Sequence, residues 1–188
     1  MASVLVPLAR GFEELEAVAL IDVMRRAGID VRTAFIEDEL HTDGIVIGAN
    51  GIGIKADTSL KYVISDDFDM IVLPGGWAGT YVLAEHPRVI ELVKEFNVDK
   101  QIAAICAAPY VLKKAGVLGN SYTCYPGAKE EINHPGYRDD KNVIIDGNIL
   151  TSAGPGTAVC FGLAIVERLV GAESMHSIKE GMLLGYCG

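Results

Sequence analysis

The sequence lacks any hydrophobic run that is long enough to cross a membrane. Its longest nearly apolar stretch, Ile102–Leu112, is far shorter than the ~20 residues that a transmembrane helix needs. The first ten residues have no basic segment ahead of their apolar stretch, and Pro7 interrupts it, so no signal peptide is predicted. We therefore expect a cytoplasmic protein that has no membrane partner.

Positive charge is also scarce. Lys and Arg number 16 among the 188 residues, against 25 Asp and Glu, which gives a formal net charge of -9. Nucleic-acid binding depends on clustered Lys and Arg that neutralise phosphates. No dedicated nucleic-acid surface is therefore expected, and we attribute the acidic excess to solubility.

The four cysteines lack the spacing of a metal site. No C-x-x-C pair or Cys/His cluster matches zinc ligands, so we expect no metal and no cofactor. The chain is also too long, and its cysteines too far apart, for a disulfide-stapled mini-domain. Reduced thiols in a reducing compartment are therefore expected. The cysteines are Cys106, Cys124, Cys160 and Cys187.

Half of the residues are hydrophobic, which is enough for a sizeable core. Short apolar runs alternate with helical patterns, without a repeat or a linker, so a single domain over residues 1–188 is predicted. This alternation is typical of an α/β fold with a mostly parallel sheet and helices on both faces. Strands are predicted over Ser3–Ala9, Ile29–Ile36, Asp69–Leu73, Gln101–Ile105, Ser121–Cys124 and Val143–Leu150, with a small hairpin or edge strands within residues 37–61. The segment Val143–Leu150 is interrupted by Asp146-Gly147, which is a hairpin signal. Helices are predicted over Phe12–Ala27, Pro87–Asn97, Cys106–Lys114, Pro155–Val170 and Ser174–Leu184.

Four predicted loops leave the carboxyl ends of strands, where functional groups collect in such sheets. All four should lie along one edge. They are Arg10–Glu16, Pro74–Trp77, Cys106–Ala108 and Ala153–Thr157.

Cys106 lies in one of these loops, among small residues. The segment Ala103–Pro109 suits a tight strand-to-helix turn, in which a nucleophile can be strained. The N-terminus of the following helix would lower the pKa of the thiol. The alternative is a buried structural cysteine, because free cysteine is among the most buried residue types. The turn favours a reactive cysteine.

Glu16 lies one turn into the first predicted helix and has apolar neighbours. Burial would raise the pKa of its carboxyl, whereas the helix N-terminus would lower it. A protonated Glu16 could donate a hydrogen bond to a thiolate and move a proton. The sequence alone favours the other interpretation, an exposed first-turn acid like Glu13 and Glu14.

The remaining loops and the histidines are less specific. Glycines at 75 and 76 would let N–H groups approach an oxyanion, although Pro-Gly-Gly also fits a plain turn. Gly154–Thr157 could present N–H groups to an anion, but a plain helix start is favoured. No histidine adjoins the four loops, and only His134 could reach them, so an acid-paired cysteine is favoured over a Cys–His pair. The histidines are His41, His86, His134 and His176.

Four segments together resemble the ThiJ/PfpI superfamily, in the branch that holds YajL and the Parkinson disease-associated protein deglycase. They follow the family's order from near the start to the last third of the chain. The segments are Gly11–Glu16, Val72–Gly76, Ala103–Pro109 and Leu150–Thr157. The resemblance implies a flavodoxin-like three-layer sandwich. It also implies a homodimer built partly on the first helix, with Asp22 and Arg26 near the interface.

The resemblance also implies roles for residues of the site. Cys106 would be the nucleophile and redox-active thiol, and Glu16 its protonated partner. Backbone near Gly75, Gly76 and Ala107 would form an anion pocket. Tyr125, Pro155 and Gly156 are further pocket candidates.

Three positions depart from other branches or from the family pattern. Ala107 stands where proteases and larger chaperones of the superfamily carry histidine, which argues against a protease. Tyr125 stands where the human branch has histidine, and tyrosine is a poor base near neutral pH. Ala153 replaces a longer polar residue, which would weaken anion binding.

The implied activity is that of a glutathione-independent glyoxalase or of a deglycase for early methylglyoxal adducts on protein or nucleotide. Cys106 would attack the aldehyde carbon, and Glu16 would move the proton between adjacent carbons. The alternative is an oxidative-stress sensor or redox-regulated chaperone, in which Cys106 is oxidised to a sulfinate.

Overall fold

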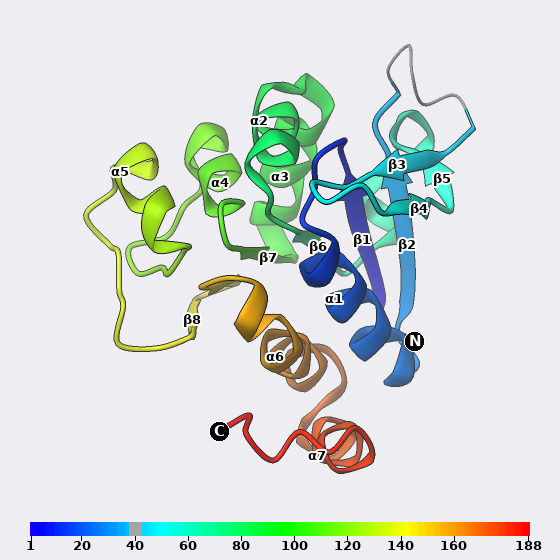
Figure 1. Cartoon of the computed structure of the whole chain (residues 1–188), viewed down its shortest axis with the longest axis vertical. Helices are drawn as coiled ribbons and strands as arrows, with labels where there is room; N and C mark the ends of the chain where they lie inside the picture. The colour runs from blue at the N-terminus through cyan, green and yellow to red at the C-terminus, as the bar shows by residue number, and fades with distance from the viewer. Residues whose placement is uncertain (38–42) are drawn as a thin grey trace.

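The computed structural model describes residues 1–37 and 43–188. A seven-stranded sheet forms its centre, and Figure 1 shows helices on either side of it. The strand order is β5-β2-β1-β6-β7-β9-β8. Neighbouring strands are parallel except β8 and β9. The bounds are β1 (Ser3–Leu8), β2 (Asp30–Phe35), β5 (Thr58–Ser59), β6 (Met70–Leu73), β7 (Gln101–Ile105), β8 (Val143–Asp146) and β9 (Ile149–Ser152).

Helices cover both faces of this sheet, because its central strands are apolar on both sides. In β6, Met70 and Val72 pack into one core, whereas Ile71 and Leu73 pack into the other. The first core includes side chains of α1 (Glu14–Arg26) and α6 (Ala158–Val170), with α7 (Ala172–Gly181) packed against it. The second includes side chains of α2 (Trp77–Glu85), α3 (Pro87–Asp99), α4 (Pro109–Ala115) and α5 (Lys129–Ile132). The predicted flavodoxin-like fold is confirmed.

Two predictions of secondary structure were wrong. The helix α2 was missed, because its sequence has no polar stripe and contains Gly79, which lets the helix approach the backbone of Phe12 closely. The segment Ser121–Cys124 is not a strand and makes only an isolated bridge at Tyr122. Two of its N–H groups donate to side chains instead of to a neighbouring strand: Ser121 N donates to Asp146 Oδ2 at 2.9 Å, and Thr123 N donates to Thr151 Oγ1 at 2.9 Å.

The predicted hairpin is present as β3 (Ile45–Ile47) and β4 (Gly53–Lys55), which pair antiparallel. It lies over the loop between β1 and α1, where Gly11 N donates to Ile47 O at 2.8 Å. The side chain of Glu14 stabilises the turn of this hairpin, because it accepts hydrogen bonds from Asn50 N at 2.6 Å and Asn50 Nδ2 at 2.9 Å. The expectation that Glu14 is exposed was therefore wrong, and its side chain is buried.

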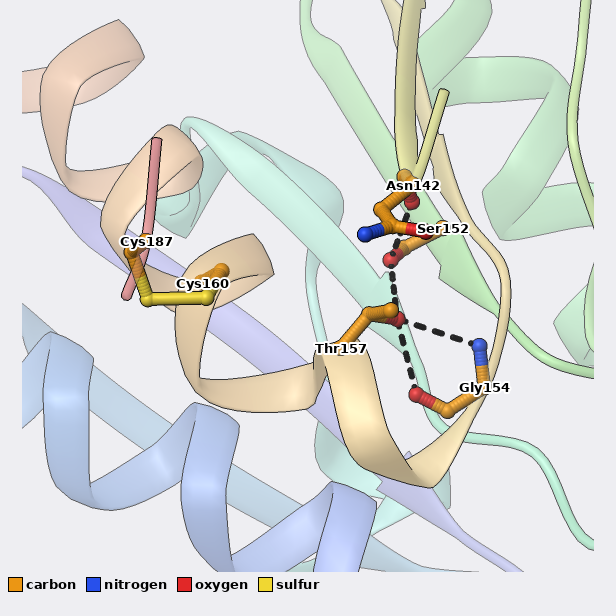
Figure 2. Close-up of a disulfide and its surroundings, with 6 residues drawn as sticks. All are labelled: Asn142, Ser152, Gly154, Thr157, Cys160 and Cys187. Atoms are coloured by element: carbon orange, nitrogen blue, oxygen red, sulfur yellow. Dashed lines mark hydrogen bonds between the residues drawn. A yellow bond between two sulfur atoms is a disulfide. The ribbon is translucent and has the colours of Figure 1, made fainter. Parts of the chain in front are cut away.

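A disulfide joins α6 to the residues that follow α7 (Figure 2). Cys160 and Cys187 form it, with their Cα atoms 5.3 Å apart. The expectation of four reduced cysteines was therefore wrong for this pair, because the chain turns back after α7 and brings Cys187 against the first turn of α6. Cys106 and Cys124 are free. Within the described part of the chain, no helix is long and apolar enough to cross a membrane.

Candidate active site

The four predicted loops meet at one edge of the sheet. The strands β1, β6, β7 and β9 that precede them are neighbours and run parallel, so their carboxyl ends lie together. Backbone hydrogen bonds join the loops: Glu13 N donates to Gly75 O at 2.9 Å, and Cys106 N donates to Ser152 O at 2.9 Å. The edge placement predicted from the sequence is confirmed.

Cys106 has a left-handed backbone, with φ of 64°. A non-glycine residue in this region is strained and persists only where its surroundings hold it. Both of its backbone groups are bonded, because its N–H donates to Ser152 O and its carbonyl accepts from Tyr125 N at 2.9 Å. Its side chain is 9% exposed, against 1% for Cys124, so Cys106 is the free cysteine at the edge of the core.

Glu16 is fully buried, so the interpretation as an exposed first-turn acid was wrong. Its Oε2 accepts a hydrogen bond from Gly75 N at 2.7 Å. Its Oε1 is buried and has no hydrogen-bond partner among the described residues. Burial raises the pKa of this carboxyl to about 7, against the hydrogen bonds with Cys106 and Gly75, which lower it.

Gly75 lies between the two side chains of this pair. A Cβ atom at this position would be 2.6 Å from Cys106 Cβ and 2.7 Å from Glu16 Oε2. These contacts are shorter than any side chain tolerates, so the close approach requires glycine. The next residue, Gly76, adopts φ of 87°, which turns the chain into α2.

The surroundings raise the pKa of the Cys106 thiol, contrary to the expectation of a lowered one. Burial is the main cause, followed by the charge and hydrogen bond of Glu16, whereas the N–H groups of Gly76 and Ala107 lower it. The N-terminus of α4 does not lower the pKa of this thiol, because the helix begins only at Pro109, which has no N–H. Cys106 and Glu16 therefore share one negative charge, and ionisation of either group opposes ionisation of the other.

The other pocket candidates are Tyr125, whose N–H donates to the Cys106 carbonyl, and the turn at 155–156. Tyr125 is half-exposed, and its ring lies against Gly127 and Gly154. Pro155 and Gly156 belong to a 3-10 turn that ends at Thr157. The sequence reasoning did not single out Ser152 and Thr151, and both support the neighbouring loops: Ser152 Oγ lies 2.7 Å from Thr157 Oγ1, and Thr151 Oγ1 accepts from Thr123 N at 2.9 Å. The only signal for them was a pair of polar residues, 151 and 152, at the end of a buried strand.

No described histidine joins the pair. His134 packs against Tyr122, with ring centroids 5.6 Å apart, and His86 lies at the junction of α2 and α3. His176 binds the carbonyl of Ala172 within α7. His41 lies outside the described residues. Residues 1–37 and 43–188 contain no group of three His, Cys, Asp or Glu that could hold a metal ion.

The fold and the site together define an α/β protein that has a free cysteine at a strained turn beside a buried acid. The chain matches the DJ-1/PfpI family over residues 2–168, and it belongs to this family. It is 45% identical over 187 residues to Protein dj-1beta of Drosophila melanogaster, covering 98% of each chain. It is 38% identical over 174 residues to Glutathione-independent glyoxalase DJR-1.2 of Caenorhabditis elegans, covering 92% of this chain and 90% of the relative.

Solved structures agree with this membership. The crystal structure of Drosophila melanogaster DJ-1beta superposes with a TM-score of 0.91 at 44% identity and covers 97% of both chains. Oxidized Toxoplasma gondii DJ-1 gives 0.89 at 34% identity, over 97% of this chain and 98% of that one.

Proposed function

We propose that this chain is a cysteine-dependent enzyme for reactive dicarbonyls or their early adducts, of the glutathione-independent glyoxalase or the protein and nucleotide deglycase type. The observation that carries the proposal is the contact of Cys106 with the buried carboxyl of Glu16, whose pKa of about 7 lets it both give and take a proton near neutral pH. A relative named as a glutathione-independent glyoxalase supports the same activity.

The first step uses the single charge of the pair. The N–H groups of Gly76 and Ala107 lower the pKa of the Cys106 thiol against the larger effects of burial and Glu16, so the form with ionised sulfur and a protonated Glu16 is the minor, reactive form of the pair. The thiolate attacks the aldehyde carbon of methylglyoxal, and Glu16 gives its proton to the new oxyanion, which yields a hemithioacetal. Gly75 N already donates to Glu16, so we assign stabilisation of the oxyanion to Gly76 and Ala107 rather than to Gly75.

The second step uses Glu16 as a carboxylate. It removes the proton from the former aldehyde carbon and returns it to the adjacent carbon, which leaves a thioester of lactate on Cys106. Water then cleaves the thioester and frees the thiol. The sum is one methylglyoxal and one water converted to one lactate, so no external oxidant or reductant is needed.

Lactate production from methylglyoxal tests this proposal. Cys106→Ser and Glu16→Gln should each lower kcat/KM by at least about 100-fold, the range of a lost acid–base group. Cys124→Ser, at the other free cysteine, which is buried in the opposite core, should retain activity. The wild-type rate should rise with pH through about 7, where the pair loses its proton. Equal rates of lactate production in wild type and Cys106→Ser would refute the proposal.

The second candidate is a sensor of oxidative stress. The unpartnered Oε1 of Glu16, when protonated, could donate to one sulfinate oxygen of an oxidised Cys106, and N–H groups of Gly76 and Ala107 could bind the other. After mild peroxide, peptide mass spectrometry should place a two-oxygen adduct on Cys106 before Cys124 is modified. Sensing without turnover is rejected if lactate forms at Cys106-dependent rates.

We also propose a homodimer through α1. Leu15 and Val18 on this helix are 58% and 50% exposed, which is unusual for two apolar side chains near one another. Asp22 and Arg26 form an ion pair within the same helix at 2.8 Å. Light scattering should give twice the chain mass, and Val18→Lys should shift it toward the monomer.

A further inference from the structure

A cavity of about 510 Å³ lies beside the Cys160–Cys187 disulfide. It is lined by α6, α7, the residues that follow α7, and the segment that leads into β8. Neither Cys106 nor Glu16 lines it, so it is separate from the candidate active site. Both halves of the disulfide face it: Cys187 is 4% exposed, and Cys160 is more exposed than its partner.

The lining of this cavity has more positive than negative side chains. Lys141 and Lys179 line it from opposite segments, against one carboxylate, Glu167. Neither lysine forms an ion pair with a carboxylate in the part of the chain that the structure describes. His176 also lines the cavity. The lining side chains therefore carry a more positive balance than the whole chain, whose net charge is -9.

We propose that this cavity takes small anionic thiols, such as carboxylate-bearing peptide thiols, and that Cys160–Cys187 is a reversible thiol–disulfide exchange site. Both halves of the disulfide and two lysines line the same cavity, and Cys160 is partly exposed in it. The combination brings a thiolate and a disulfide sulfur together.

The exchange has two balanced steps. The bound thiolate attacks Cys160 Sγ, the more exposed half, which forms a mixed disulfide while Cys187 leaves as a thiolate and takes a proton. A second thiolate attacks the small-molecule sulfur of the mixed disulfide and expels Cys160. The products are an oxidised small-molecule disulfide and two protein thiols. Cys160 lies in the first turn of α6, where the helix N-terminus stabilises the departing thiolate.

The exchange site is connected to the backbone that holds Cys106. Thr157, one turn before Cys160, lies 2.7 Å from Ser152 through their hydroxyl oxygens (Figure 2). Ser152 Oγ also donates to Asn142 O at 2.8 Å, and Asn142 lines the cavity. The carbonyl of Ser152 accepts the Cys106 N–H. Opening the disulfide should therefore loosen the strained turn and make Cys106 more accessible.

The test measures reduction of the disulfide in the full, oxidised chain. Glutathione, a peptide thiol with two carboxylates, is compared with cationic cysteamine and neutral 2-mercaptoethanol at equal thiolate concentrations, and alkylation followed by mass spectrometry counts thiols at 160 and 187. We expect glutathione to react about 3- to 5-fold faster than cysteamine at low salt, because the attraction between partly exposed charges is of this size. The difference between the two rates should disappear in 1 M salt, which screens these charges. Trapped intermediates should carry glutathione on Cys160.

Charge variants separate this site from a general surface effect. Lys141→Gln with Lys179→Gln should remove the preference for glutathione and leave the 2-mercaptoethanol rate unchanged. Lys94→Gln, an exposed lysine on α3, is the matched control and should change neither rate. The proposal would be overturned if wild type were reduced by all three thiols at the same rate, or if the double lysine variant were reduced more slowly by all three thiols to the same extent. Reduction of the disulfide only in urea would also overturn it.

The link to Cys106 has its own readout. Iodoacetamide should alkylate Cys106 at least about 3-fold faster once the disulfide is open, in reduced wild type and in Cys187→Ser. An unchanged rate, with the fold intact by circular dichroism, would refute the coupling. None of these measurements uses methylglyoxal, so failure here is distinguishable from failure of the proposed enzyme activity.

Discussion

Replacing Glu16 by glutamine should stabilise the fold at neutral pH while it removes activity. Burial raises the pKa of Glu16 from its ordinary 4.5 to about 7. Each pKa unit corresponds to about 1.4 kcal/mol, so ionisation of Glu16 in the folded state costs about 3 kcal/mol. Glutamine keeps the size and the acceptor for Gly75 N but carries no charge to bury.

The sign of the effect with pH is fixed by the direction of this shift. Below pH 4.5 both the folded and the unfolded chain hold the proton, so Glu16 has no ionisation cost. Between pH 4.5 and about 7 the unfolded chain has lost the proton and the folded chain keeps it, so wild type loses stability as pH rises. The stability advantage of Glu16→Gln should therefore grow through this window and level off above it.

Urea unfolding of wild type and Glu16→Gln at pH 4.5, 6 and 8, with the disulfide kept oxidised, measures this difference. We expect the gap in the free energy of unfolding to widen by about 3 kcal/mol between the first and last pH. The exposed Glu180→Gln should show no such widening. A gap that is constant with pH would refute the idea that Glu16 is held protonated by burial.

Three further predictions concern the same framework. Gly75→Ala should lower the free energy of unfolding in urea by about 1–3 kcal/mol, because its Cβ would meet Cys106 Cβ at 2.6 Å. Gly156→Ala is the control: this position faces open space, so the same assay should show a change of less than about 0.5 kcal/mol. Reducing the disulfide, whose cysteines are 27 residues apart, should lower it by about 3 kcal/mol, and an unchanged melting temperature in a phosphine reductant would contradict this. Glu14→Gln should cost about 1–3 kcal/mol, seen as faster amide exchange at Asn50 and Ile52. Burial raises the pKa of Glu14, but its hydrogen bonds lower it further, so the net pKa lies below 4.5. The contribution of Glu14 to stability should therefore be lost as pH falls below 4.5. A difference in the free energy of unfolding between wild type and Glu14→Gln that persists at pH 3 would contradict this.

The sequence predicted what depends on local pattern. Apolar runs such as 101–105 located the buried strands, and the small residues around Cys106 located the turn. Contacts between residues that are distant in the sequence could not be predicted in this way. The burial of Glu16 depends on Gly75 N, 59 positions away, and the first turn by itself suggested an exposed acid. Cys187 meets Cys160 only because the chain returns to α6 after α7, a path that cysteine spacing does not encode.

The three acids at the start of α1 leave little freedom for insertions and deletions. Glu13 accepts from Glu16 N at 2.7 Å, Glu14 holds the hairpin turn, and Glu16 faces Cys106. Each added residue turns a helix by about 100°. One residue inserted before Glu13 would rotate the carboxylates of Glu14 and Glu16 away from Asn50 and Gly75, whereas Glu13 would keep its partner within the helix. Loops usually tolerate changes in length, but the segment from Arg10 to Glu13 should not.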